Sequence, residues 1–178
     1  MILIGIGANL PSKRYGTPVQ TCEAALHALD RVDGVRVVRR SRWFESAPVP
    51  ISDQPWYVNG VCIIETGLEP GALLDIMHHI EADFGRVRSE KNAPRVLDLD
   101  LLAYDDFITG EAAEMQVPHP RLHERAFVLF PLQDLVPGWV HPKMGQTLET
   151  MVAVLSQDQI ARPLEMRHEP DGDSYDED

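Results

Sequence analysis

Hydrophobic positions near the start of the chain change from a strand pattern to a helix pattern. Residues 2–7 are mostly apolar and β-branched, which predicts a short buried strand that turns at 7–9. Apolar side chains then recur at helical spacing. Thr17 is a suitable N-cap, Pro18 is favoured at the first helical position, and an Asp-Gly pair follows as a stop signal. The pattern therefore predicts a helix over 18–32.

Two strands, a second helix and a further strand are predicted next. Residues 35–45 are rich in β-formers, and 57–66 alternate between two faces. A loop over 46–56 with three prolines separates them, too long for a tight hairpin turn. An apolar stripe of 3.6-residue period predicts a helix over 69–84, and alternation of leucine with aspartate predicts a strand over 96–104.

The order of these elements, βαββαβ, matches a ferredoxin-like α+β sandwich. In that fold an antiparallel sheet carries both helices on one face, and the other, more polar face stays open for a ligand. Additional C-terminal helices are expected over 122–135 and 147–157. We therefore expect one domain over residues 1–158, followed by an acidic C-terminal tail over 159–178.

Charge and cysteine content limit the range of partners and compartments. The 178 residues include 16 Lys and Arg against 28 Asp and Glu, for a net charge of −12. This sign disfavours nucleic acids and anionic membranes, so a phosphate site would have to be local. Two cysteines without paired spacing argue against a disulfide framework or a zinc site, and no targeting or membrane-spanning segment is visible. We expect a cytoplasmic protein, with a monomer as the default.

Asp98 and Asp100 are the first candidates for chemistry. Two residues apart on a strand, their side chains project from the same face about 6 to 7 Å apart. Because such a pair repels itself, a bound divalent cation is the simplest compensation, and hard oxygen ligands favour Mg²⁺ over Zn²⁺. The alternative is an edge strand whose two acids face water.

Arginines lie close to this aspartate pair in the sequence, and an aromatic residue beside an amide is found on another predicted strand. Arg86, Arg88 and Arg95 suit phosphate oxygens, so a polyphosphate site is indicated, although ordinary surface salt bridges are the alternative. Tyr57 and Asn59 share a strand face and offer an aromatic plane beside an amide, as a flat heteroaromatic ligand requires; a core tyrosine is the alternative.

Three further polar residues remain ambiguous. His119, between two prolines, is either positioned by a rigid turn or a plain loop residue. His78 and Glu81, three apart on the predicted helix, either join the site or form a solvated face. The common nucleotide-binding and hydrolase motifs are absent from the sequence.

Five segments together resemble the 6-hydroxymethyl-7,8-dihydropterin pyrophosphokinases of folate biosynthesis. They are Ile-Gly-Ala-Asn-Leu at 6–10, Asp-Gln-Pro-Trp-Tyr-Val-Asn at 53–59, Gly-Arg-Val-Arg at 85–88, Ala-Pro-Arg-Val-Leu-Asp-Leu-Asp-Leu-Leu at 93–102, and Pro-His-Pro-Arg-Leu-His-Glu-Arg-Ala-Phe-Val-Leu at 118–129. The resemblance implies transfer of the β,γ-pyrophosphoryl group of ATP to the pterin hydroxymethyl group, with release of AMP. It covers about residues 1–140, and small molecules are then the only partners expected.

The resemblance also implies roles for individual residues. Asp98 and Asp100 would hold two Mg²⁺ ions. The two aspartates, together with Arg86 and Arg95, would be the catalytic residues. The expected ATP-binding residues are His78, Glu81, Arg86, Arg88, Arg95, Leu101, His119 and Arg125. The expected pterin-binding residues are Ser46, Ala47, Val49, Tyr57, Asn59 and Phe127. Loops 46–56 and 89–94 would act as lids.

The chain departs from the family pattern at two positions, and two rival functions stay open. Asn92 stands where some members carry a lid tryptophan, and Pro120 where some carry tyrosine. An Asp-x-Asp pair on a ferredoxin-like sheet also suits a Mg²⁺-dependent nucleotidyltransferase, which would release pyrophosphate instead of AMP. A non-catalytic ligand-binding module would show no turnover at all.

Overall fold

The computed structural model describes residues 1–86 and 94–165. The elements in chain order are β1 (Ile2–Ala8), α1 (Pro18–Asp30), β2 (Val35–Arg40), β3 (Phe44–Ser46), β4 (Tyr57–Thr66), α2 (Pro70–Asp83), β5 (Asp98–Tyr104), the 3-10 helix η1 (Leu122–Glu124), α3 (Ala126–Leu135), α4 (Leu148–Ala153) and β6 (Ala161–Pro163). Up to β5 this order confirms the predicted ferredoxin-like α+β arrangement.

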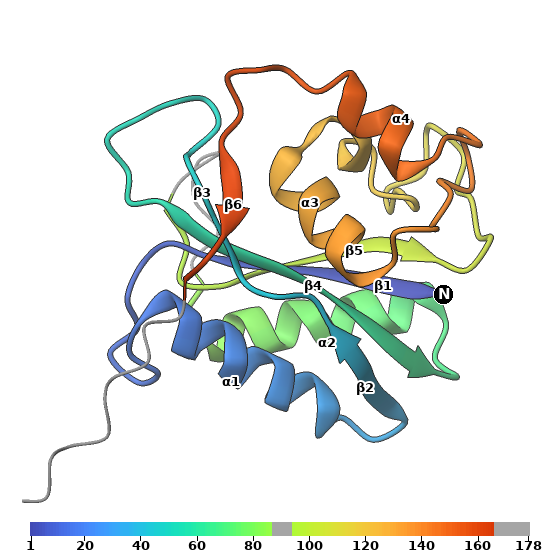
Figure 1. Ribbon diagram of the computed structural model, residues 1–178. Coiled ribbons are helices and arrows are strands. Elements are labelled where there is room, and N and C mark those ends of the chain that lie inside the picture. The colour runs from blue at the N-terminus through green and yellow to red at the C-terminus, as the bar shows by residue number, and fades with distance from the viewer. Residues whose placement is uncertain (87–93, 166–178) are drawn as a thin grey trace, which may run out of the picture.

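The strands form one antiparallel sheet in the order β5-β1-β4-β3-β6, with β2 also paired to β4 (Figure 1). The sequence predicts one strand over 35–45, but the structure divides it into β2 and β3. The Trp43 ring packs directly over Gly60, where an added Cβ would lie 2.6 Å from the ring. Ser41 also uses its Oγ to accept the N–H of Val61 at 3.0 Å. The buried indole and the serine lie between β2 and β3, where the regular pairing of this segment with β4 is interrupted.

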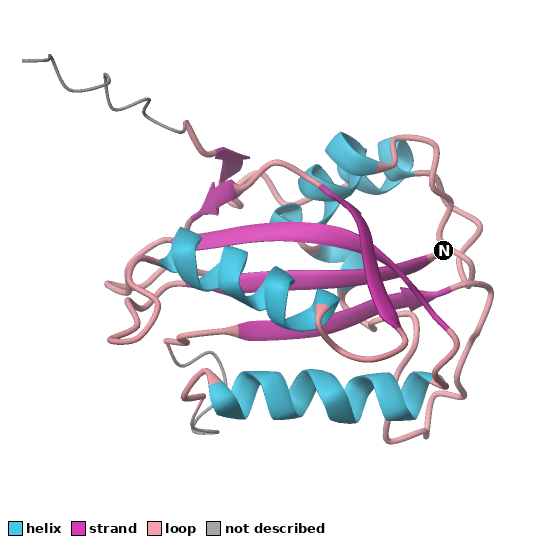
Figure 2. Cartoon of the chain, turned by 90° about the horizontal axis from the view of Figure 1, so that it is seen from below, coloured by secondary structure: helices cyan, strands magenta, loops and turns pink. Residues whose placement is uncertain are grey.

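Helices cover both faces of the sheet (Figures 1 and 2). The helices α1 and α2 pack on one face over the larger core cluster, which includes Ile4, Leu29, Cys62, Leu73 and Met77. The expected open face is only partly open, because α3 covers part of it over a second cluster and α4 packs on α3. That cluster includes Leu3, Val61, Leu102, Leu129 and Leu132. What stays uncovered on this face is the part that carries the polar residues of β4 and β5.

The predicted C-terminal helices are shorter than expected. The sequence predicts one helix over 122–135, yet Arg125 takes an extended conformation (φ −114°, ψ 113°) that separates η1 from α3. The helix predicted over 147–157 is α4, which ends at Ala153. In addition, β6 is an unexpected edge strand, formed by residues that the sequence assigns to the tail. In the described ranges, no helix combines the length and the apolar character needed to cross a membrane.

Candidate active site

A cavity of about 1160 Å³ opens where β5, α2 and the start of α3 meet. Because β5 is an edge strand, the cavity reaches around its free edge and is lined from both helical layers. Every predicted site residue that the structure describes lines it: Ser46, Ala47, Val49, Tyr57, Asn59, His78, Glu81, Arg86, Arg95, Asp98, Asp100, Leu101, His119, Arg125 and Phe127. The remaining one, Arg88, lies outside the described residues.

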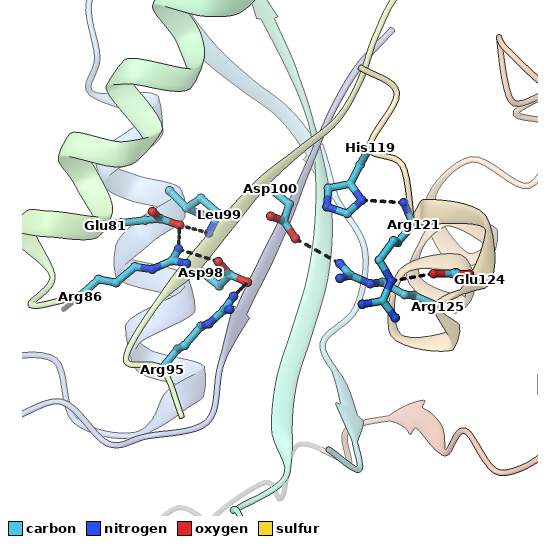
Figure 3. A network of polar contacts seen from close by, with 10 residues as sticks. All are labelled: Glu81, Arg86, Arg95, Asp98, Leu99, Asp100, His119, Arg121, Glu124 and Arg125. Carbon is cyan, nitrogen blue, oxygen red and sulfur yellow. Dashed lines mark hydrogen bonds and ion pairs between the residues drawn. The ribbon is translucent and has the colours of Figure 1, made fainter. Parts of the chain in front are cut away.

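The two aspartates of β5 lie on the same face of the strand, as the alternation predicts, and point to different cations (Figure 3). Asp98 accepts from Arg86 at 2.6 Å and from Arg95 at 2.5 Å. The nearest cation to Asp100 is Arg125, at 3.7 Å. The alternative is right that β5 is an edge strand and wrong that its two acids simply face water, because both carboxylates lie in the pocket beside arginines.

Among these carboxylates, Asp100 has the most strongly shifted pKa. Burial in the pocket and the adjacent charge of Asp98 raise the pKa of Asp100 to about 7, with burial the larger cause. Arg125 and Arg95 oppose this rise without cancelling it. An additional cation next to Asp100 would therefore stabilise its ionised form.

Glu81 projects from α2 to the free edge of β5. Only 2% of the residue is exposed, so the solvated-face alternative is wrong for it. Its Oε1 accepts the backbone N–H of Leu99 at 2.7 Å, and the same oxygen forms an ion pair with Arg86. Burial raises the pKa of Glu81, while the Leu99 N–H and Arg86 act in the opposite direction. The residue thereby satisfies an edge-strand donor and fixes the position of Arg86 (Figure 3).

His119 faces the pocket from the loop before η1. Its Nδ1 accepts the backbone N–H of Arg121 at 3.1 Å. Burial lowers the pKa of the ring to about 4, and the positive charge of Arg125 contributes to the shift. His119 is therefore a neutral imidazole at pH 7, with its Nε2 available for a ligand.

The other end of the pocket combines amide, hydroxyl and aromatic groups. The Nδ2 of buried Asn59 donates to the Ser46 Oγ at 2.6 Å, which ties β4 to the end of β3. The Tyr57 hydroxyl donates to the Oε1 of Gln54 at 3.3 Å. Across the pocket, Phe127 lies under the Arg125 guanidinium, 5.4 Å from the ring centroid. Aromatic faces beside an ordered amide suit a flat heteroaromatic ligand.

The sequence model of the 7,8-dihydro-6-hydroxymethylpterin-pyrophosphokinase (HPPK) family matches residues 3–137. This range includes all the carboxylates and arginines described above. The chain belongs to the HPPK family. Outside the matched range, the HPPK pocket of this chain is completed by Val154, Leu155, Ser156 and Gln159.

Curated HPPK relatives cover most of the chain. The 2-amino-4-hydroxy-6-hydroxymethyldihydropteridine pyrophosphokinase of Pseudomonas aeruginosa is 37% identical over 161 residues, which are 90% of this chain and 95% of that protein. The enzyme of the same name from Synechocystis is 37% identical over 84% of this chain and 73% of its own length. The one from Haemophilus influenzae is 39% identical over 78% and 83%.

Solved HPPK structures share the fold. The HPPK-DHPS protein of Plasmodium falciparum matches 85% of this chain with a TM-score of 0.66 at 13% identity. The chain spans only 43% of the length of that protein. At this identity the likeness concerns the fold, and it agrees with the sheet order and helical layers described above.

The donor set of the HPPK pocket fits a magnesium–phosphate complex better than an all-protein metal cage. Among the described residues, no group of three or more His, Cys, Asp or Glu side chains is placed to hold a metal ion. Two carboxylates, Asp98 and Asp100, share one strand face. Mg²⁺ is typically held by one or two carboxylates, by substrate phosphates and by water. The residues present therefore fit Mg²⁺ that arrives with a polyphosphate.

Asn9, in the Ile-Gly-Ala-Asn-Leu segment at 6–10, is a residue to which the sequence alone assigns no role, and it holds the backbone beside the pocket. It is 1% exposed, and its Oδ1 accepts the backbone N–H of Arg95 at 2.8 Å. Its Nδ2 donates to the carbonyl oxygen of Pro55 at 3.0 Å. The signal available in the sequence is a polar side chain directly after a buried strand, at the point where the chain turns.

Proposed function

We propose that this chain transfers the pyrophosphoryl group of ATP to the hydroxymethyl oxygen of 6-hydroxymethyl-7,8-dihydropterin, yielding AMP and the pterin diphosphate in folate biosynthesis. Membership of the HPPK family and the relatives named as pyrophosphokinases support this activity. The single observation that carries the proposal for these residues is one cavity with an ionic end and an aromatic end. An enzyme that transfers pyrophosphate from ATP to a pterin needs this combination, because it must hold a triphosphate and a flat ring together.

The ionic end would bind the triphosphate. Asp98 and Asp100 would hold Mg²⁺, and we propose two ions because two carboxylates share this face. Bound Mg²⁺ would neutralise phosphate charge and hold the reacting groups in place. Arg86, Arg95 and Arg125 now pair with acids of the chain, and the oxygens of a bound triphosphate would be alternative partners for them.

Charge balance supports this arrangement. Four arginines face four acids in the contacts of Figure 3: Arg86, Arg95 and Arg125 contact Glu81, Asp98 and Asp100, and Arg121 pairs with Glu124. Two Mg²⁺ ions neutralise the charge of a fully ionised triphosphate. Binding of ATP together with two Mg²⁺ ions would therefore leave the net charge of the pocket unchanged. Arg86 and Arg95 would then stabilise the negative charge that develops on the oxygen between Pα and Pβ as AMP leaves.

The aromatic end would orient the pterin. We propose that Asn59 and Ser46 bind the polar edge of the ring, while Tyr57 and Phe127 contact its faces. Ala47 and Val49 in loop 47–56 would close this end of the pocket. Exclusion of water matters because a bound triphosphate in an open site would be hydrolysed.

Other ATP contacts belong to the proposal as well. Neutral His119 would donate to a phosphate oxygen through Nε2, and His78 with Leu101 would line the nucleoside side of the cavity. Glu81, in contrast, would act on the nucleotide mainly through Arg86, because it is almost completely buried. We also propose that the protein acts in the cytoplasm as a monomer.

A product assay tests the proposal. Purified protein is incubated with ATP, Mg²⁺ and 6-hydroxymethyl-7,8-dihydropterin, and nucleotides and pterins are separated by chromatography. AMP and a pterin diphosphate should appear in equal amounts, and neither should form without the pterin or in excess EDTA. Release of pyrophosphate with an adenylylated product would indicate a nucleotidyltransferase, and pterin binding without any turnover would indicate a binding module.

A further inference from the structure

Gln159, in the coil between α4 and β6, binds the backbone on both sides of Arg125. Its Oε1 accepts the N–H of Ala126 at 2.9 Å, and its Nε2 donates to the carbonyl oxygen of Glu124 at 2.8 Å. Arg125 between them is extended (φ −114°, ψ 113°). In an extended chain, the C=O of one residue and the N–H two residues later point to the same side. One side-chain amide therefore satisfies both groups, as a neighbouring strand would.

The hydrogen bond to Gln159 takes the place of a side-chain cap at the N-terminus of α3. Arg125 is the N-cap of α3, and its side chain makes no capping hydrogen bond. The first N–H groups of a helix have no partner within the helix, so they need an outside acceptor. For Ala126, the acceptor is supplied by a residue 33 positions later in the chain.

The break that Gln159 stabilises directs Arg125 into the pocket. The Arg125 guanidinium lies 3.7 Å from Asp100 and 5.4 Å from the centroid of the Phe127 ring. Residues 122–135 have a continuous helical pattern, so an extended Arg125 is not the local preference of this segment. If η1 and α3 merged into one helix, the direction of this side chain would change.

The same short segment also supports the opposite wall of the pocket. The carbonyl oxygen of Ile160 accepts the N–H of Ala47 at 3.1 Å, and Ala161 pairs with Ser46 in the sheet. Figure 1 shows β6 running beside β3 at this edge. Residues 159–161 thus contact both the start of α3 and the end of β3, although they lie beyond the range matched by the family.

We propose that Gln159 is a positioning residue: its amide holds Arg125 in the extended conformation that presents the guanidinium to the triphosphate. The inference rests on the proposed function, because the role of Arg125 toward ATP belongs to that proposal. Gln159 acts through backbone hydrogen bonds, and both polar ends of its amide are engaged in them.

A double-mutant cycle between Gln159 and Arg125 tests this inference. The variants are Gln159→Met, which keeps the length of the side chain and removes both hydrogen bonds, Arg125→Ala, and the two combined. Gln157→Met is the matched control, since Gln157 is exposed and has no hydrogen bond within the part of the chain that the structure describes. The measurements are kcat and KM for ATP and the melting temperature of each variant.

We expect Gln159→Met to lower kcat/KM for ATP about tenfold, because a small misplacement of a positioned group has effects of this size or larger. On the Arg125→Ala background the same change should have almost no effect. Gln157→Met should match the wild type. If Gln159→Met does not fold, Gln159→Ala enters the same cycle.

Three results would overturn the inference. They are unchanged kcat/KM in the Gln159 variant, an equal loss in the Gln157 control, and a loss that is just as large with Arg125 absent. The last would mean that Gln159 supports the domain without acting through Arg125. A wild-type protein that forms no AMP would overturn the proposed function and this inference with it, whereas an active wild type combined with any of the three results would overturn the inference alone.

Discussion

The backbone N–H of Arg95 donates a hydrogen bond of 2.8 Å to the side-chain Oδ1 of Asn9. In return, the N–H groups of Asn9 and Leu10 donate to the carbonyl oxygen of Arg95, at 3.0 and 3.2 Å. The Asn9 Nδ2 donates to Pro55. One buried asparagine thus joins the end of β1 to the chain that enters β5 and to loop 47–56. An arginine proposed to bind phosphate is thereby held in a fixed relation to a loop proposed to cover the pterin.

Replacing Asn9 should weaken both the fold and the activity. Asn9→Ala leaves the Arg95 N–H without its acceptor, so we expect the free energy of unfolding to fall by about 2 kcal/mol. Misplacement of Arg95 should lower kcat/KM for ATP roughly tenfold. Urea denaturation and steady-state kinetics measure these effects. If Asn9→Ala keeps the wild-type kcat/KM and unfolds at the wild-type urea concentration, the hydrogen bond to the Arg95 N–H is not the important contact.

Two substitutions of Glu81 should separate its structural contact from its charge. Glu81→Ala removes the acceptor of the Leu99 N–H and the ion-pair partner of Arg86, so we expect a loss of roughly 3 kcal/mol in the free energy of unfolding. Glu81→Gln keeps an acceptor for Leu99 and should lose less than half as much. If the two variants unfold at the same denaturant concentration, the edge-strand hydrogen bond contributes nothing measurable.

Loss of either β5 aspartate should abolish most of the turnover. Asp98→Ala and Asp100→Ala should each lower kcat by at least ~10³-fold, because magnesium at this position would supply several kcal/mol of charge neutralisation. Asp106→Ala, at an exposed position just after β5, is the control and should be fully active. Circular dichroism spectra check that the fold is retained. Near wild-type rates in both aspartate variants would contradict the metal assignment.

His141 should make the stability of the protein depend on pH. The residue is 3% exposed, and its Nδ1 accepts the backbone N–H groups of Lys143 and Met144, both at 3.2 Å. Burial lowers the pKa of His141, with a smaller contribution from His123. The unfolded chain then binds the proton first, at a pKa of about 6.5. Stability due to His141 is therefore present above that pH and is lost as the pH falls below it.

The variant His141→Asn isolates this effect, since its Oδ1 can accept the same N–H groups and does not titrate in this range. Denaturant unfolding at pH 7.5 and at pH 5.5 gives the change in the free energy of unfolding for each protein. We expect the wild type to lose up to about 1 kcal/mol more than the variant over this interval. An equal pH dependence in the two proteins would show that His141 is protonated as easily when folded as when unfolded.

Local patterns in the sequence predict the elements that build the ionic end of the pocket. The two-residue period of β5 places Asp98 and Asp100 on one face, and the structure confirms it. The stripe of α2 predicts a helix over 69–84, and the observed helix runs from Pro70 to Asp83. These features depend on neighbours in the chain, which is why periodicity alone is sufficient to predict them.

Contacts between distant segments are not encoded in any local period. The short strand β6 forms by pairing with β3, and the sequence of residues 161–163 contains no strand pattern of its own. Likewise, the extended Arg125 depends on an amide 34 residues away along the chain, so the helical pattern of 122–135 conceals the break. The sequence predicts Glu81 as a site residue, but its partners, the Leu99 N–H and Arg86, follow from the packing of α2 against the edge of β5.

The position of phosphoryl attack is the most direct test of the whole account. The protein is given ATP labelled separately at the α-, β- and γ-phosphorus, together with Mg²⁺ and 6-hydroxymethyl-7,8-dihydropterin, and the label in each product is measured. We predict that the β and γ labels both appear in the pterin product while the α label stays in AMP. Transfer of the γ label alone with formation of ADP, or transfer of the α label with release of pyrophosphate, would contradict the account.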